Sequence, residues 1–229
     1  AIPDRVKNAY ISAEDKNFYK HMGIDFLALS KAAFDMGEAK LSGRQGRARG
    51  ASTITQQVAK NFLLTSDRTI DRKAKEAILS LRIERAYPKE KILALYLNVI
   101  FLGLGSYGVA GAALGYFDKS VRELELHEVA YLAALPKGPN NYHPYRQTEA
   151  AIERRNWVIE RMFVNGYISA TEAEEAKAKD LSVRPRKKGS YLAASEYFSE
   201  EVRREILERY GEDQLYEGGL SIRTTLDPK

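Results

Sequence analysis

The sequence predicts a mainly α-helical protein, and three observations support this fold class. Apolar residues recur every three or four positions through most of the chain, as on the packed face of a helix. Residues that favour helix starts precede several of these stretches, and Pro88, Pro136, Pro139 and Pro144 fall between them. With 229 residues and 44% hydrophobic content, the chain is long enough to fold as one domain or as two lobes that share a core.

In chain order, the first predicted helix starts at Ser12, just before Glu14 and Asp15. Residues 38–50 are rich in glycine and arginine and have no hydrophobic period, which predicts a mobile basic loop. Ser66 and Asp67 precede the next predicted helix, whose apolar flank runs from Ala74 to Leu81. This flank can pack without burying the charged residues opposite it.

Residues 92–117 contain no charged residue, which raises the question of a membrane span. Asn98, Ser106 and five glycines interrupt the stretch, so we predict a buried helix, a glycine-rich turn and a second helix. Further helices are predicted around residues 129–133 and 157–162, after Thr171, and over 191–210. Residues 182–189 suggest an extended break, and residues 218–227 alternate as a strand does.

Composition limits the other structural classes. The chain has no cysteine, so neither disulfides nor a cysteine metal site can hold it. No signal peptide follows Ala1, which leaves either a cytoplasmic protein or one whose anchor has been removed. Of the net charge of +5, the segment from Lys40 to Glu76 carries +6, because nine Lys and Arg face three acids there. This local excess predicts an anionic ligand, such as a phosphate on a lipid, a nucleic acid or a membrane surface.

Three motifs carry candidate chemistry. Glu14 and Asp15 precede Phe18, His21 and Gly23. By itself Glu14 reads as a capping or first-turn acid, and His21 as a structural histidine hydrogen-bonded to backbone. Two carboxylates on either side of a basic, hydroxyl-rich stretch would also suit a reaction that needs a base for a hydroxyl and cations for a phosphate leaving group.

The second motif lies at a predicted loop-to-helix junction, residues 50–61, where free backbone N–H groups and the helix dipole favour an anion. An ordinary N-capped helix is the alternative. Gln57 and Lys60 lie three residues apart and share a helix face. In the third motif, Arg72 and Glu76 share a face with Lys73 at its edge, which could form either a phosphate clamp or a surface ion-pair network.

The chain resembles glycosyltransferase family 51, the glycosyltransferase domain of class A penicillin-binding proteins, over nearly its whole length. The resemblance rests on five motifs in order: Glu14-Asp15; Ala51-Ser52-Thr53-Ile54-Thr55-Gln56-Gln57; Arg72-Lys73-x-x-Glu76; Lys91-Ile92-Leu93-x-x-Tyr96-Leu97-Asn98; and the segment from His127-Glu128 to Pro139-Asn140. It implies a lysozyme-like bilobed fold, with a large helical lobe and a small membrane-facing jaw lobe at about residues 26–50. The glycosyltransferase domain would then cover residues 1–217, and residues 218–229 would be a strand or linker towards an absent transpeptidase domain.

The resemblance also implies an activity: polymerisation of lipid II into β-1,4-linked glycan strands, with inversion and release of undecaprenyl pyrophosphate. Glu14 would be the general base and Glu76 the second carboxylate. The family's phosphate-binding cations match Lys60, Arg68, Arg72 and Lys73, and its polar cleft residues match Ser52, Thr53, Gln56 and Gln57. Asn98, Lys137 and Asn140 match positions that are structural or line the cleft.

Glu76 has two possible roles, which are to orient the cations or to bind a divalent metal, Mg or Mn, that bridges the pyrophosphate. The expected partners are lipid II, the lipid-linked glycan strand, a membrane surface and phosphoglycolipid inhibitors of the moenomycin type. The expected location is the outer face of the bacterial inner (plasma) membrane. We expect the N-terminal anchor and the penicillin-binding domain to lie outside this sequence.

Two rival functions come from other classes of protein. A lysozyme-like hydrolase would also use an N-terminal Glu, but it has no anionic leaving group and no need for the basic segment. A nucleic-acid binder would explain the charge but would be expected to interleave aromatic residues with it, and Lys40 to Glu76 holds only Phe62. We therefore expect no nucleic-acid partner.

Overall fold

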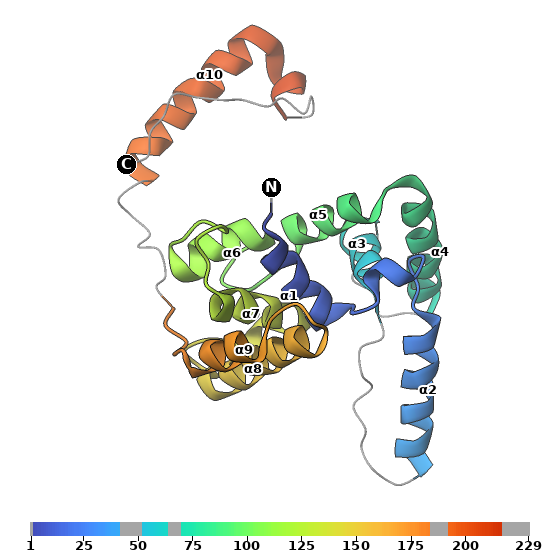
Figure 1. The fold of residues 1–229 in the computed structure, drawn as a ribbon. Coiled ribbons are helices and arrows are strands. Elements are labelled where there is room, and N and C mark those ends of the chain that lie inside the picture. Colours follow the sequence, from blue (N-terminus) through green and yellow to red (C-terminus); the bar gives the residue numbers. More distant parts are fainter. Residues whose placement is uncertain (1, 42–51, 64–69, 184–191, 217–229) are drawn as a thin grey trace. The chain divides into compact units, whose positions relative to one another are not determined.

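The computed structural model describes residues 2–41, 52–63, 70–183 and 192–216 (Figure 1). These residues form α-helices and short 3-10 helices, and within the described ranges the β-structure is limited to one isolated bridge between Phe101 and Tyr107. The mainly α prediction is therefore confirmed. The chain divides into two compact units, residues 1–185 and 186–229. The described part of the second unit is helix α10, Leu192–Tyr216, whose helical backbone is broken at Gly211.

The larger group of helices in the first unit builds the hydrophobic core. Its members are α1 (Asp4–Glu14), α5 (Lys89–Val99), α6 (Gly108–Phe117), α7 (Leu126–Ala134), α8 (Thr148–Val164) and α9 (Ala170–Ala178). Helix α7 contacts α1, α6, α8 and α9, and every residue from Glu128 to Ala134 is buried. From Val129 to Ala134 α7 has no charged residue on any side, which is typical of a helix inside a core, and the buried Glu128 is paired with Lys119.

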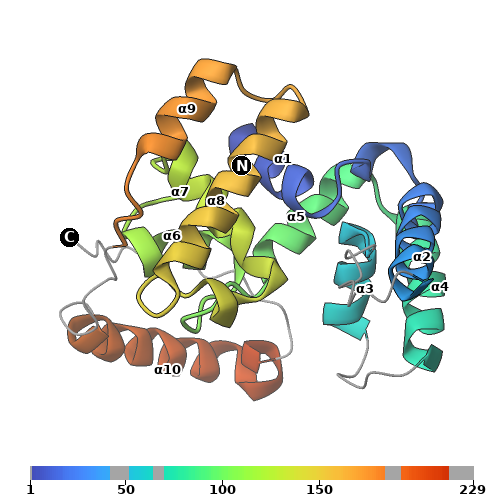
Figure 2. The same cartoon turned by 90° about the horizontal axis from the view of Figure 1, so that it is seen from below.

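A second group consists of α2 (Phe26–Leu41), α3 (Ile54–Leu63) and α4 (Ile70–Ala86). Helix α3 packs against α4 and α5, so it connects the two groups. In both ribbon views α2, α3 and α4 lie on the side of the first unit away from α7, α8 and α9 (Figure 2). The candidate active-site residues that the sequence predicts lie in both groups of helices.

Helix α3 begins with a capping box. The backbone N–H of Gln56 donates to Oγ1 of Thr53 at 3.2 Å, and the backbone N–H of Thr53 donates to Oε1 of Gln56 at 2.9 Å. Two N–H groups that the first helical turn leaves without partners are satisfied in this way. Thr53 Oγ1 also donates to the carbonyl of Gly23 at 2.6 Å, which fixes the start of α3 against the end of the first motif.

The prediction for residues 92–117 is confirmed. Helices α5 and α6 are joined by a tight turn, and Gly108 lies so close to α5 that a Cβ there would come within 2.4 Å of the Asn98 carbonyl oxygen. Its φ of +69° also favours glycine. Across the described residues, every helix is too short or too polar to span a bilayer.

Several predicted boundaries are wrong. Ser12 lies inside α1, which starts at Asp4 after Pro3, and Ser169 rather than Thr171 caps α9. Residues 38–41 are helical rather than part of a loop, because Glu, Ala, Lys and Leu are good helix formers that extend α2 past Gly37. The rest of that predicted loop lies outside the described residues. The start signals Ser66 and Asp67, most of the predicted break at 182–189 and the strand at 218–227 lie outside them as well.

Helix α4 packs with the opposite face from the one its pattern suggests. Glu76 and Ser80 are 2% and 0% exposed, whereas Ile78 on the apolar flank is 53% exposed. The prediction that the apolar flank packs and leaves the charges outside is therefore wrong. The physical reason is that Glu76 faces two cations and the Ser80 hydroxyl donates to the Glu76 carbonyl, so these polar groups of α4 are satisfied inside the protein.

Candidate active site

A cavity of about 580 Å³ brings together most of the candidate residues. It is lined by Ala13, Glu14, Ser52, Gln57, Lys60, Arg72, Lys73, Glu76, Pro136, Lys137, Arg154 and Trp157. These side chains come from α1, α3, α4, α8 and the short helix Leu135–Lys137, with Ser52 from the segment just before α3. Five of them are basic and two are acidic, so the cavity suits an anionic ligand.

Glu14 is the last residue of α1. An acid is favoured at a helix N-terminus and disfavoured at a C-terminus, so the interpretation of Glu14 as a first-turn acid is wrong. Its Oε2 atom accepts a hydrogen bond of 2.8 Å from Nε2 of Gln57 on α3. A carboxylate at the C-terminal end of α1 does not stabilise the helix. Because Glu14 also lies on the cavity wall, its position supports a chemical role.

Burial raises the pKa of the Glu14 carboxyl above its ordinary value. The hydrogen bond from Gln57 and the charges of Arg154 and Lys137 act in the opposite direction but do not cancel the effect of burial. A carboxylate with a raised pKa is a stronger base once it is ionised. Glu14 therefore has the environment that a general base needs.

The residues next to Glu14 hold it in place. Asp15 caps α1 and accepts hydrogen bonds from the backbone N–H of Ile54 and from Nε2 of His21, each at 3.0 Å. The backbone N–H of Gly23 donates to Nδ1 of His21 at 3.2 Å, which places the ring proton on Nε2. The prediction of a structural histidine is confirmed, and these bonds fasten the end of α1 to the start of α3.

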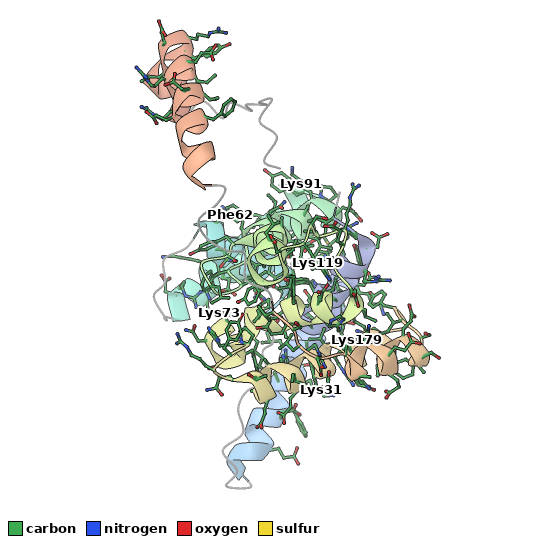
Figure 3. The ribbon with its side chains drawn as sticks, turned by 90° about the vertical axis from the view of Figure 1, so that its left-hand side faces the viewer. Lys31, Phe62, Lys73, Lys91, Lys119 and Lys179 are labelled. Carbon is green, nitrogen blue, oxygen red and sulfur yellow. The ribbon has the colours of Figure 1, made fainter. Side chains whose placement is uncertain are left out.

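Glu76 occupies the opposite kind of environment. Its side chain is 3% exposed, and its two oxygens accept from Nη1 of Arg72, at 2.8 Å, and from Nζ of Lys73. Lys73 Nζ also donates to Oγ of Ser52 at 2.9 Å, which connects α4 to the residue before α3. Figure 3 labels Lys73 on α4 and Phe62 on the neighbouring helix α3. Glu76 fixes two cations at the cavity wall, so the alternative of a surface ion-pair network is wrong for a carboxylate this deeply buried.

The other predicted site residues fall into three groups. Lys60 and Ser52 line the cavity as expected. Thr53 and Gln56 are 2% and 6% exposed, and their side chains make the capping box instead of lining the cavity, which fits the alternative of an N-capped helix for these two positions. Arg68 lies outside the described residues.

The cavity contains residues that the site prediction missed. Arg154 and Trp157 reach it from α8, where the guanidinium carbon of Arg154 lies 3.7 Å from the centroid of the indole ring. This is a cation–π contact that orients the guanidinium group. Their spacing of three residues puts them on one flank of α8, next to the buried residues Ala151 and Val158, and this was the available signal. Lys137 lines the cavity, as its motif position allowed, whereas Asn98 and Asn140 are absent from its lining.

A second cavity of about 470 Å³ adjoins the first and shares Gln57, Lys60 and Pro136 with it. Its remaining walls include the aromatic rings of Phe62, Phe101 and Tyr107. The shared residues place the two cavities side by side, and Lys60 is the charged residue in the described lining of the second. Together the two cavities provide room for a ligand larger than a single phosphate group.

The described residues do not form a metal site, because no three His, Cys, Asp or Glu side chains among them come together. Both Glu76 oxygens are already bound by cations. This donor set does not fit a divalent ion in the described arrangement, and no step below depends on one. A metal bridging Glu76 and a pyrophosphate stays a prediction.

Several known proteins resemble this chain over most of its length. The family model described as Transglycosylase matches residues 1–163. The chain is 48% identical to penicillin-binding protein 1A of Aquifex aeolicus over 99% of its length and 30% of that protein, and 42% identical to the Escherichia coli protein of the same name over 100% of its length and 26% of that protein. The crystal structure of penicillin-binding protein 1A from Haemophilus influenzae matches 71% of this chain and 21% of that one, with 36% identity and a TM-score of 0.43.

The chain therefore spans less than a third of the length of these curated relatives. The matched family region, residues 1–163, contains every residue that lines the charged cavity. The family match and the identities agree with the resemblance that the five sequence motifs carried. The chain belongs to the transglycosylase family of peptidoglycan glycosyltransferase enzymes.

Proposed function

We propose that this enzyme joins a lipid-linked glycan strand, the donor, to lipid II, the acceptor, with inversion at the anomeric carbon and release of undecaprenyl pyrophosphate. The observation that carries the proposal is that one cavity holds a carboxylate with a raised pKa and a separate cluster of fixed cations. Glycosyl transfer to a hydroxyl from a pyrophosphate needs both groups.

In this mechanism Glu14 acts on the acceptor. As the 4-hydroxyl oxygen of the acceptor attacks the donor's anomeric carbon, its proton passes to the Glu14 carboxylate. The bond between that carbon and the pyrophosphate oxygen breaks, and the electron pair leaves with the pyrophosphate. Attack from the face opposite the leaving group gives inversion. A positioned general base contributes about 10²–10⁴ in rate.

The cations act on the donor. Arg72 can bind phosphate oxygens with two N–H groups, and Lys73 and Lys60 add point charges at the same wall. Because Glu76 and Ser52 already hold two of these cations in position, little reorganisation is needed as charge develops on the leaving group. Arg68 belongs to this cluster by resemblance.

We also propose that the enzyme works at the outer face of the bacterial inner membrane. Helix α2 supports the membrane part of this proposal, since Phe26, Leu27 and Phe34 are 68%, 79% and 72% exposed. Exposed apolar side chains of this size on one helix favour a lipid surface over water. A phosphoglycolipid inhibitor of the moenomycin type would place its phosphate against the same cations.

Incubation with lipid II tests the proposal, with the products separated by size. Glycan polymer is the expected product, and it should disappear in the Glu14→Gln variant. Shortened glycan from added peptidoglycan would instead indicate a hydrolase. Absence of any product, with the chain folded and lipid II in detergent or vesicles, would contradict the proposed function.

A further inference from the structure

Gln57 lines both cavities, and its carboxamide contacts the proposed base. Its Nε2 donates to Oε2 of Glu14 at 2.8 Å, and its Oε1 faces the Tyr96 hydroxyl at 3.5 Å. Tyr96 is 0% exposed, so this end of the amide faces the protein interior. Both ends of the Gln57 carboxamide are therefore directed at protein groups.

The two tyrosines beneath Glu14 limit how its carboxylate can be held. Tyr10, one helical turn earlier on α1, and Tyr96 on α5 are fully buried, with ring centroids 6.1 Å apart. The Tyr10 hydroxyl makes no hydrogen bond within the described structure. Among the described residues, Gln57 alone donates a hydrogen bond to Glu14, and it binds Oε2 only. Oε1 is the oxygen left to receive a proton.

Other charged and titratable groups around Glu14 act on it through space. Asp15 and Tyr10 belong to its own segment, Tyr96 to α5, Arg154 to α8 and Lys137 to the short helix Leu135–Lys137. Lys60, Arg72, Lys73 and Glu76 share the cavity with it from α3 and α4. These groups influence the charge of the carboxylate, but they leave its orientation to Gln57.

We propose that Gln57 is a positioning residue that holds the Glu14 carboxylate by Oε2 and presents Oε1 to the acceptor hydroxyl, instead of binding the pyrophosphate. The inference rests on the proposed function of Glu14 as the base. It changes the role of Gln57 from the one its motif implies. Tyr96 supports the orientation by facing the amide oxygen of Gln57.

The test uses Gln57→Met, which keeps the length of the side chain and removes the donor. Loss of a hydrogen bond to the ionised form should move the Glu14 pKa upward by about one unit. The acid limb of the kcat–pH profile on lipid II should move to higher pH by the same amount, so kcat below the limb should fall about tenfold. Activity should recover at higher pH, and KM should stay within about twofold.

A different pattern would overturn the proposal. If the acid limb stays in place while KM, or the affinity for a phosphate-bearing donor analogue, worsens tenfold or more, Gln57 is a substrate ligand. An unchanged profile with unchanged KM would also contradict a positioning role. Gln56→Met is the matched control, because it removes the neighbouring capping amide and should lower the melting temperature without moving the acid limb.

Two further measurements cover the cases in which the first variant fails to fold or the chain does not polymerise lipid II. Tyr96→Phe should move the acid limb in the same direction by a smaller amount, and an unmoved limb there counts against the proposal. Titration of the Glu14 carboxyl carbon by NMR reports its pKa without turnover. A higher pKa in Gln57→Met supports the positioning role even if the proposed activity fails, and an unchanged pKa overturns it.

Discussion

Two carboxylates line the same cavity in different surroundings. Glu14, at the end of α1, has one neutral amide donor and two buried tyrosines beneath it. Glu76, within α4, has a cation on each oxygen. Glu14 can therefore take a proton from a hydroxyl, whereas Glu76 would have to give up ion pairs to do so. The difference shows that position, more than residue type, separates chemistry from binding in this site.

The largest expected effect is on turnover at Glu14. Glu14→Gln keeps the shape of the side chain and removes the base, so kcat on lipid II should fall by about 10²–10⁴. Product formation over time measures it. Glu149→Gln, at an exposed position on α8, is the matched control and should keep full activity. Turnover within about threefold of the unmodified chain in Glu14→Gln would remove Glu14 from the mechanism.

The second largest effect is expected on donor affinity, at the cations that pair with Glu76. Arg72→Ala should weaken a phosphate-bearing donor analogue by about 1.5–3 kcal/mol, because a charge-assisted contact is lost. Calorimetry or fluorescence titration measures the affinity. Lys75→Ala on the same helix removes a cation from an exposed pair with Asp71, and it should change affinity by less than about 0.5 kcal/mol. Equal losses in the two variants would mean that Arg72 acts only through bulk charge.

The two carboxylates should also have opposite effects on stability. The folded-state pKa of Glu14 lies above its unfolded value, so its contribution to stability falls as pH rises through the window between them. At neutral pH the ionised side chain is a cost that Glu14→Gln relieves, so the melting temperature should rise. Glu76→Gln leaves Arg72 and Lys73 without an anion and should lower stability by about 1–3 kcal/mol. Thermal unfolding at pH 7 checks both signs, and a shared sign would contradict the comparison.

The smallest effect is on salt dependence. Added salt should weaken the donor analogue, since five basic side chains line the cavity. Arg72→Ala should make that dependence shallower, and Glu14→Gln should leave it nearly unchanged. Binding measured at several ionic strengths gives the slopes. If the salt dependence became shallower in Glu14→Gln and not in Arg72→Ala, the phosphate would bind near Glu14 and not at the cations of α4.

The sequence was most informative where motifs and periodicity agreed. The helical class, the helix–turn–helix over residues 92–117 and the meeting of Glu14, Lys60, Arg72 and Glu76 followed from spacing and resemblance. The packed face of α4 did not, because Glu76 is buried by partners that a helical pattern does not include. Arg154 and Trp157 were missed for a similar reason: their helix reaches the cavity only through tertiary packing.

Capping residues also misled the prediction of the site. Thr53 and Gln56 have the polar side chains of a cleft, but the start of α3 uses them for its own N–H groups. Their neighbours Ser52 and Gln57 do face the cavity. Ser52 and Thr53 are neighbours in the sequence, as are Gln56 and Gln57, yet one of each pair faces the cavity and the other caps α3. Successive residues point in different directions, so the sequence pattern did not separate the two roles.

The central claim is that the chemistry of Glu14 is separable from donor binding by the cations of α3 and α4 in the same cavity. The most direct test is the affinity of the Glu14→Gln variant for a phosphate-bearing donor analogue. We predict an affinity within a few fold of the unmodified chain in a variant that no longer polymerises lipid II. A loss of affinity of tenfold or more would show that Glu14 takes part in binding the donor and would contradict the account.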